Sequence, residues 1–358
     1  MSAQHQAQGT APVISVRQLV KRYGDLTALD HFDLTVRRGE IFGLLGPNGC
    51  GKTTAINCML QLLSYQKGSI ELFGEPMSPR RYDLKRRIGI VPQQVAVFDE
   101  LTVTENIDAF CSLYVSDRAL RRTLVEDAIA FTGLERFRRF RPRKLSGGLL
   151  RRLNIACGIA HRPELIFFDE PTVAVDPQSR NAILEGILRL VDEGATVVYT
   201  SHYMEEVEQI CGRVMIMDRG RAIAEGTVGE LKGMIDVGEK IVAEIPDLPD
   251  RALDAVRYLP CVLRASYRGR ELHVACGQGQ GHLTEVLGVL AGTGIEPVRV
   301  FSEPPTLNDV FLEMTGSDLR DGGGAEPDSD TGRAAEDEAA GATNVPSLFA
   351  RLMRRSGR

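Results

Sequence analysis

The residues best suited to chemistry lie in a glycine-rich loop at residues 46–54. This loop has the pattern G-x-x-x-x-G-K-S/T, with an apolar, strand-like run before it and a helix-forming run after it. Glycines let consecutive backbone N–H groups turn inward, and the following helix adds its positive N-terminal end, so the loop is suited to bind a polyphosphate. In this interpretation Lys52 reaches the β- and γ-phosphates and Thr53 holds Mg²⁺. The residues of this predicted phosphate loop are Gly46, Pro47, Asn48, Gly49, Cys50, Gly51, Lys52, Thr53 and Thr54.

Two carboxylates follow a second apolar run. Residues 165–168 are continuously apolar, as expected of a central parallel strand covered on both faces, and Asp169 and Glu170 come directly after them. Ligands of open α/β sheets lie beyond the carboxyl ends of the strands, so we expect these acids to bind Mg²⁺ and orient a water molecule. A further buried strand at residues 196–200 leads to His202 at the same edge, where it either contacts the γ-phosphate or only satisfies a helix start.

Four features give weaker signals. Tyr23 lies in a turn between two predicted strands, where it either stacks on a base or is a half-buried strand-end tyrosine. Residues 145–148 form another glycine-rich turn that opens a helix. Residues 136–144 are strongly basic with two phenylalanines, which suits a solvated loop face, a nearby lipid or membrane partner, or nucleic acid. The Cys50 thiol lies beside a helix N-terminus, which predicts a lowered pKa and reactivity toward alkylating reagents.

The composition indicates an ordinary soluble protein of about two domains. The chain has 358 residues, 43% hydrophobic and 25% charged, with a formal net charge of −5, and nothing in this balance suggests nucleic-acid binding. No run approaches the ~20 apolar residues of a membrane helix, and residues 1–12 lack the apolar core of a signal peptide, so we expect a cytosolic protein. The seven cysteines are scattered without a C-x-x-C pair, which predicts neither a disulfide framework nor a zinc site.

The order of predicted elements divides the chain into three parts. Residues 13–235 predict an α/β domain with a helical insert at about residues 95–144. Residues 239–315 predict the order βαββαβ, which suits a small ferredoxin-like α+β domain. Residues 316–358 predict a disordered acidic tail with a basic amphipathic end, either an inert tail or a segment that binds a membrane surface.

These features occur in the order and spacing of one protein family. The chain resembles the ATP-binding subunit of an ABC transporter over about residues 13–235, with the P-loop NTPase fold of such cassettes. Residues 307–312 resemble the C-terminal extension of type-two ABC exporters, which move drugs, antibiotics, lipids or polysaccharides. The matching segments are the phosphate loop, Pro92-Gln93, Leu145-Ser146-Gly147-Gly148, Asp169-Glu170-Pro171-Thr172, Asp176 and His202.

The resemblance implies a role for each matching residue. Tyr23 stacks on the adenine of ATP, and the phosphate loop binds the phosphates, with Lys52 and Thr54 in contact with them. The roles at the reacting end are as follows: Thr53 and Asp169 bind Mg²⁺, Gln93 senses Mg²⁺ and water and reports to the membrane partner, Glu170 is the general base, and His202 is the γ-phosphate switch.

The resemblance also implies an assembly. The Ser146 hydroxyl and the Gly148 amide, with Gly147 between them, cap the γ-phosphate of the other protomer, so a complete site needs two cassettes packed head to tail. This chain has one cassette, and we therefore expect a homodimer that binds a separate integral-membrane permease at the cytoplasmic face of the membrane. Two departures from the family pattern are Leu149, in place of glutamine, and the segment Val173-Ala174-Val175 before Asp176. The first leaves the serine and backbone donors in place, so we expect ATPase activity to survive. The second alters the loop that the resemblance assigns to communication across the dimer.

Two other functions share the same ATP-binding machinery. A soluble ABC-type ATPase acting on ribosomes carries two cassettes in tandem, and one acting on DNA carries long coiled coils inside the cassette. The single cassette and short insert favour a transport subunit over both. A regulatory module that holds ATP without hydrolysis is disfavoured, because Lys52, Asp169, Glu170 and His202 are all present.

Overall fold

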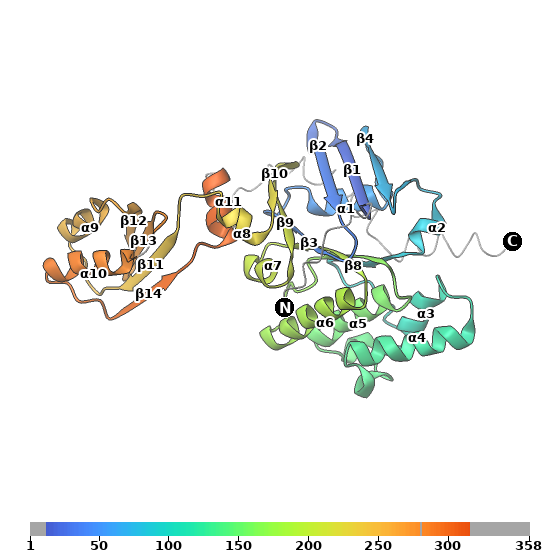
Figure 1. Cartoon of the computed structure of the whole chain (residues 1–358). Coiled ribbons are helices and arrows are strands. Elements are labelled where there is room, and N and C mark those ends of the chain that lie inside the picture. Colours follow the sequence, from blue (N-terminus) through green and yellow to red (C-terminus); the bar gives the residue numbers. More distant parts are fainter. Residues whose placement is uncertain (1–11, 280, 316–358) are drawn as a thin grey trace, which may run out of the picture. The chain divides into compact units, whose positions relative to one another are not determined.

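The computed structural model describes residues 12–279 and 281–315, which form two compact units (Figure 1). The first unit contains residues 12–225 and the second contains residues 226–315. The domain boundary predicted at residues 235–239 stays a prediction, and the predicted tail lies outside the described residues.

The first unit is built around a six-stranded sheet. Its strands are β3 (Ile41–Leu45), β6 (Ile88–Val91), β7 (Leu165–Asp169), β8 (Thr196–Ser201), β9 (Arg213–Asp218) and β10 (Arg221–Gly226). They lie in the order β10-β9-β3-β8-β7-β6, and the pairs from β9 to β6 are parallel. Every residue of β3, β7 and β8 is buried, as their continuous apolar runs predict for strands covered on both faces.

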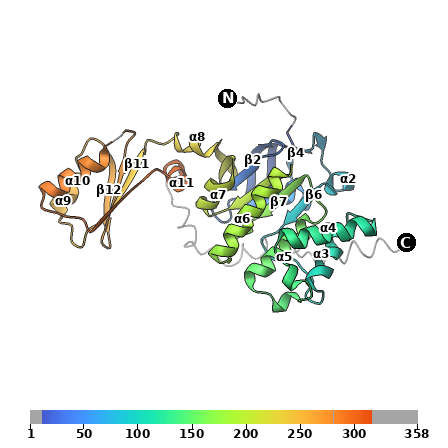
Figure 2. The same ribbon diagram turned by 60° about the horizontal axis from the view of Figure 1, so that its bottom comes forward.

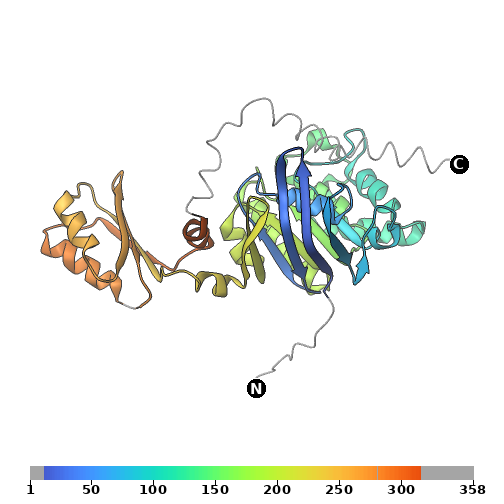
Figure 3. The same cartoon turned by 90° about the horizontal axis from the view of Figure 1, so that it is seen from above.

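A second, antiparallel sheet covers the first helix of this unit. Its strands are β1 (Ile14–Tyr23), β2 (Leu26–Val36), β4 (Lys67–Leu72) and β5 (Glu75–Pro76), in the order β2-β1-β4-β5. Helix α1 (Lys52–Met59) shares one hydrophobic core with both sheets. Figure 3 shows the long strands β1 and β2 in blue. Strand β2 begins at Leu26, because Tyr23 and Leu26 pair across a tight turn.

The remaining helices of the first unit include the predicted insert. They are α2 (Tyr82–Lys85), α3 (Val103–Ser112), α4 (Arg118–Phe131), α5 (Gly147–Ile159), α6 (Pro177–Asp192) and α7 (Met204–Ile210), with short 3₁₀ turns η1 (Glu135–Phe137) and η2 (Pro142–Lys144). Helices α3 and α4 pack on α5 through a separate apolar core (Figure 2). A capping box opens α3, where the Thr102 backbone N–H donates to the Glu105 carboxylate at 2.7 Å.

The second unit has the predicted ferredoxin-like order of elements. These are α8 (Val228–Lys232), β11 (Glu239–Glu244), α9 (Asp250–Arg257), β12 (Val262–Arg268), β13 (Glu271–Cys276), α10 (His282–Gly292), β14 (Arg299–Glu303) and α11 (Leu307–Thr315). The sheet order is β12-β13-β11-β14, and α9 and α10 bury their apolar residues against it. Across the described part of the chain, every helix falls short of the length and hydrophobicity needed to span a bilayer.

Candidate functional site

The predicted site residues meet at one edge of the parallel sheet because the strands before them are in register. Leu45 at the end of β3 pairs with Ser201, Asp169 pairs with Thr200, and β6 ends opposite Phe168. The carboxyl ends of parallel strands therefore deliver the phosphate loop, the paired acids, the 92–93 segment and the histidine to the same place.

Glu170 lies at the centre of this edge. Its Oε1 is 3.5 Å from the Lys52 Nζ, and its Oε2 accepts a hydrogen bond from the Gln93 Nε2 at 3.0 Å. The His202 Nδ1 lies 3.3 Å from the same Oε2. Both Lys52 and Glu170 are buried, so their opposite charges interact with little screening by solvent. The structure thus brings together the four residues that the sequence analysis predicts to be catalytic.

The backbone of Glu170 is held in an unusual conformation. Its φ is +46°, in the left-handed region that non-glycine residues rarely adopt. Its N–H donates to the Thr200 Oγ1 at 3.0 Å, and its carbonyl accepts from the buried Arg151 guanidinium at 2.8 Å. Arg151 also donates to the Pro92 carbonyl at 2.9 Å, which ties the loop after β6 to the loop after β7. These bonds fix the direction in which the Glu170 side chain leaves the strand.

The phosphate loop fits an anion at its centre. The Lys52 Nζ donates to the Gly46 carbonyl at 2.8 Å and to the Pro47 carbonyl at 3.1 Å, so the ammonium group lies across its own loop. A Cβ at Gly46 would lie 2.4 Å from the Met217 carbonyl oxygen, and Gly51 has a φ of +109°. Helix α1 begins after Gly51 with no side-chain cap, which leaves N–H groups of its first turn for an anion.

Oxygen ligands for a cation lie beside this loop. The Thr53 Oγ1 donates to one Asp169 oxygen at 2.9 Å, and the Thr200 Oγ1 donates to the other at 2.7 Å. Burial raises the pKa of Asp169, and the two hydroxyl hydrogen bonds oppose that rise. A hydroxyl and a carboxylate are ligands that suit Mg²⁺, so Thr53 and Asp169 fit the ion that the sequence predicts.

A second buried acid, Glu206 on α7, organises the side of the sheet next to His202. One of its oxygens accepts hydrogen bonds from Tyr199 at 2.7 Å, Thr172 at 2.8 Å and Ser201 at 3.1 Å. The other lies 3.2 Å from the Arg180 Nε. The sequence analysis missed Glu206, Thr200 and Arg151 because each is one polar residue inside an ordinary strand or helix.

Two groups of predicted residues lie apart from the Glu170 cluster. The Ser146 Oγ caps α5 by accepting from the Leu149 N–H at 3.3 Å, and a Cβ at Gly148 would lie 2.5 Å from the Ser179 Oγ. Ser146, Gly147 and Gly148 therefore lie at the start of α5, which packs against the start of α6. Tyr23 ends β1, with the Lys21 Nζ 4.4 Å from the centre of its ring.

Cys50 does not have the properties that the sequence analysis predicts. Its side chain is only 3% exposed, and burial raises the pKa of its thiol although Lys52 lies nearby. The thiol packs beneath the loop, where a Cβ at Gly46 would be 2.6 Å from its sulfur. Desolvation outweighs the nearby positive charge, so the hypothesis of a reactive, low-pKa thiol is wrong.

The basic run at residues 136–144 makes contacts within the insert. Arg138 pairs with Glu126 at 2.9 Å, and Arg143 lies 3.7 Å from Asp99. The rings of Phe137 and Phe140 meet edge to face at 5.6 Å between centres. These contacts favour the interpretation of this run as a solvated loop face.

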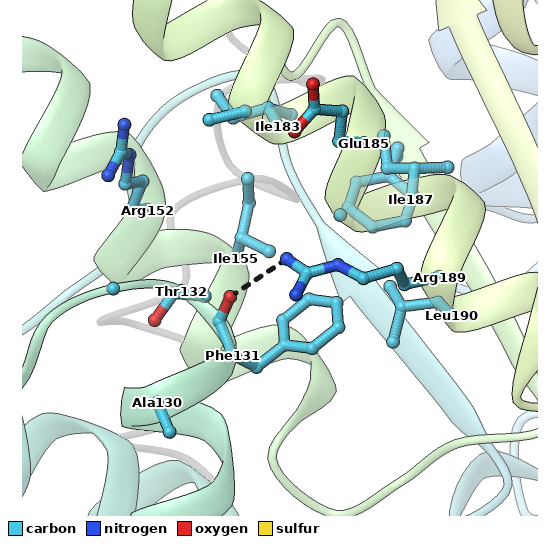
Figure 4. A pocket seen from close by; sticks show the side chains of 14 residues that line it. Ala130, Phe131, Thr132, Arg152, Ile155, Ile183, Glu185, Ile187, Arg189 and Leu190 are labelled. Carbon is cyan, nitrogen blue, oxygen red and sulfur yellow. Dashed lines mark hydrogen bonds between the residues drawn. The ribbon is translucent and has the colours of Figure 1, made fainter.

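A separate cavity of about 280 Å³ lies between α4, α5 and α6 (Figure 4). Across it, the Arg189 guanidinium donates to the Phe131 carbonyl at 3.4 Å and lies 4.6 Å from the centre of the Phe131 ring. Ile155 and Ile183 give the cavity an apolar wall. Since its lining contains none of the predicted site residues, it is not part of the candidate site.

Comparison with known proteins gives concordant matches. The family model described as ABC transporter matches residues 29–173. The linearmycin resistance ATP-binding protein LnrL of Bacillus subtilis (strain 168) is 35% identical over 312 residues, covering 86% of this chain and 100% of that protein. The Nod factor export ATP-binding protein I of Ralstonia nicotianae is 34% identical over 315 residues, covering 87% of this chain and 97% of that protein.

A solved structure is also similar to this chain. It is the dimeric structure of a post-hydrolysis state of the ATP-binding cassette MJ0796 bound to ADP and Pi. It has a TM-score of 0.55 and 26% identity, and the match covers 60% of this chain and 98% of that one.

Proposed function

Because the chain belongs to the ATP-binding subunits of ABC transporters, we propose that it drives an exporter by hydrolysing ATP and relaying the change to a separate integral-membrane permease. It is an ABC-type ATPase of an exporter family. Its relatives are named for linearmycin resistance and Nod factor export, which supports an export role. We propose that the exported molecule is a drug, antibiotic, lipid or polysaccharide. In this function the chain lies on the cytoplasmic face of the membrane, where it binds the permease.

The observation that carries the proposed chemistry is the set of contacts around Glu170. A water molecule held by the Glu170 carboxylate attacks the γ-phosphate in line, and Lys52 neutralises charge on the phosphates. Gln93 holds the carboxylate from its other side with a hydrogen bond at 3.0 Å, and the His202 Nδ1 lies 3.3 Å from the same oxygen. When bound at Thr53 and Asp169, Mg²⁺ supplies further charge neutralisation.

The contacts of Ser146 and Gly148 support a site shared between two chains. Gly148 lies against the start of α6, where a Cβ would be 2.5 Å from the Ser179 Oγ and 3.1 Å from the Asp176 Oδ2, and Ser146 caps the same end of α5. The phosphate loop instead contacts the acids at the end of β7. In a head-to-tail homodimer, Ser146 and Gly148 of one chain complete the phosphate loop of the other. The similar cassette MJ0796, which is dimeric, supports this arrangement.

Mixing two inactive variants tests the shared site. Lys52→Ala removes the phosphate contact, and Ser146→Arg blocks the capping surface, so each homodimer should be inactive. Each site of the head-to-tail dimer combines the phosphate loop of one chain with Ser146 of the other. In a mixed dimer, one site therefore carries both substitutions and the other carries neither. We expect phosphate release to recover to at most about a quarter of the wild-type rate on mixing, since half of the dimers are mixed and half of their sites are intact. Mixtures that stay inactive would contradict the shared site.

Isolation from the native cell tests the transport role. The tagged Glu170→Gln variant, crosslinked in the presence of ATP, should retain an integral-membrane protein. An ATP-dependent dimer that co-sediments with ribosomes or DNA, and retains no membrane protein, would contradict the transport role while leaving the ATPase in place.

A further inference from the structure

A second cluster of potential ligands lies in the second unit. Cys261 precedes β12, His282 is the first residue of α10, and Glu285 follows one helical turn later. One ligand atom of each, the cysteine sulfur, an imidazole nitrogen and a carboxylate oxygen, lies within 4.8 Å of the others. The spacing of three residues places His282 and Glu285 on the same face of α10. The fold thus brings a thiol, an imidazole and a carboxylate around one point.

The imidazole of His282 is buried in this cluster without hydrogen-bond partners among the described residues. Its side chain is only 8% exposed, and neither ring nitrogen has a hydrogen-bond partner among the described residues. A neutral imidazole has one N–H donor and one acceptor nitrogen, and buried polar atoms in folded proteins are almost always partnered. Two buried nitrogens without partners on one ring therefore point to a ligand.

The surrounding backbone is shaped around this ring. A Cβ at Gly279 would lie 2.8 Å from the His282 Nε2, and Gly279 has a φ of +148°. A side chain at that position would displace the histidine from the cluster, so the glycine permits the close approach.

A further thiol lies next to the cluster. Cys276 ends β13 and pairs with Val262 across the sheet, and the Gly277 N–H donates to the Cys261 carbonyl at 2.9 Å. Both cysteines are free thiols.

We propose that Cys261, His282 and Glu285 form a binding site for a divalent cation of intermediate softness, with Zn²⁺ as the best match, and that Cys276 or a water molecule supplies the fourth ligand. Thiolate, imidazole and carboxylate are the ligands that Zn²⁺ takes in tetrahedral sites, whereas Mg²⁺ and Ca²⁺ prefer oxygen. Coordination releases the Cys261 thiol proton to solvent, and the Cys276 thiol proton as well where Cys276 is the fourth ligand. The ion joins the start of β12 to the start of α10 within the second unit.

Cobalt substitution of the full chain tests this site. After metal removal with a chelator, Co²⁺ alone is titrated into the reduced protein, and thiolate-to-cobalt charge transfer is followed in the near ultraviolet. We expect a band that saturates at one Co²⁺ per chain and is displaced by Zn²⁺. The Mg²⁺ site at Thr53 and Asp169 has only oxygen ligands, so it cannot give this band.

Variants decide which residues bind the ion. Cys261→Ser should abolish the band where water is the fourth ligand and lower it by about half where Cys276 is, because it removes one of at most two thiolates. Glu285→Gln should weaken Co²⁺ binding by about tenfold or more. Glu285 is exposed, so its variant tests ligation even where Cys261→Ser does not fold. The matched control is His273→Ala, which removes an exposed histidine of the same unit and should leave the titration unchanged.

Three outcomes would overturn the proposal. They are a reduced wild-type chain that gives no band, a folded Cys261→Ser variant that keeps the full wild-type band, and a Glu285→Gln variant that binds Co²⁺ as tightly as wild type. ATPase activity is not the readout, so a failure here is separate from a failure of the proposed function.

Discussion

Each unit gathers polar side chains at one point, but the two clusters differ in whether those side chains have partners within the protein. Around Asp169 and Glu170, buried charges face Lys52, Thr53 and Thr200, so the protein supplies the partners itself. Around His282, both ring nitrogens are buried without a partner among the described residues. The first cluster is organised before any ligand arrives, whereas the second needs a ligand to complete it. The predictions below test this difference, beginning with the largest expected effect.

The first prediction concerns the carboxylate at the centre of the organised cluster. Glu170→Gln should lower the rate of ATP hydrolysis by about 100-fold or more, because the amide cannot accept a proton from the attacking water. ATP binding should persist, since the phosphate loop is unchanged. Steady-state phosphate release and equilibrium nucleotide binding measure the two effects.

The matched control for this prediction is Glu164→Gln. Glu164 precedes the same strand, β7, and pairs at the surface with Arg87 at 2.6 Å. The same chemical change there should leave hydrolysis within about twofold, as expected for a surface substitution. Equal losses in the two variants would contradict the special position of Glu170.

The second prediction concerns a residue that holds the cluster together. Thr200→Val keeps the shape of the side chain but removes the hydrogen bonds to the Asp169 carboxylate and from the Glu170 N–H. Hydrogen bonds to charged groups contribute about 1.5–3 kcal/mol, so we expect the hydrolysis rate to fall by about tenfold or more. Turnover is measured per folded molecule, with the folded fraction taken from thermal unfolding.

Thr196→Val is the matched control at the other end of β8. Thr196 is equally buried, and its hydroxyl accepts from the Gly39 N–H at 3.0 Å, away from the acids. This variant should lose stability while keeping its turnover per folded molecule. If both variants lost turnover alike, Thr200 would be a structural residue only.

The third prediction separates stability from function at Asp169. Burial raises the folded-state pKa of Asp169 above its ordinary value of 3.8, so the folded chain holds this proton more tightly than the unfolded chain does. Ionisation of Asp169 therefore lowers the free energy of unfolding as pH rises. This loss is absent below the ordinary pKa of the unfolded chain and complete above the raised pKa of the folded chain. Asp169→Asn should raise the apo unfolding midpoint at neutral pH by a few degrees, at about 2–4 °C per kcal/mol.

This gain should vanish as pH falls toward the ordinary pKa of Asp169. Asp83→Asn is the control, because its pKa is shifted in the opposite direction: Arg81 lowers the pKa of the exposed Asp83 to about 2. That variant should not gain stability at neutral pH. Thermal unfolding across pH measures both, and an Asp169→Asn variant less stable than wild type at neutral pH would contradict the prediction.

The two clusters also differ in how far sequence could predict them. The phosphate loop and the acids at residues 169–170 are local patterns at strand ends, and the rule for parallel sheets places them together. The roles of Thr200 and Arg151 follow only from the strand register and the packing of α5, which no local pattern encodes. The Cys50 hypothesis failed because Cys50 belongs to a hydrophobic core that also contains Met215 and Met217 of β9, far along the chain.

The second cluster was missed for a related reason. Metal-site spacing rules look for ligands close together in sequence, such as C-x-x-C. Here the thiol precedes β12, while the imidazole and carboxylate open α10, so only the closed ferredoxin-like fold brings them to one point.

The smallest predicted effect tests the incomplete cluster directly. In the metal-free chain, His282→Leu should raise the unfolding free energy of the second unit by about 1 kcal/mol, because it removes buried polar atoms that lack partners. A partly buried histidine of the first unit is the control: the His161 Nε2 lies 3.1 Å from the Ile88 carbonyl oxygen, and its ring stacks on Tyr114 at 3.8 Å. His161→Leu should therefore be destabilising. Calorimetry with and without Zn²⁺ measures both variants. With Zn²⁺ bound, wild type should become more stable than His282→Leu. Wild type should be more stable than His161→Leu whether or not Zn²⁺ is present. A metal-free His282→Leu chain less stable than wild type would show that this imidazole already has its partners within the protein.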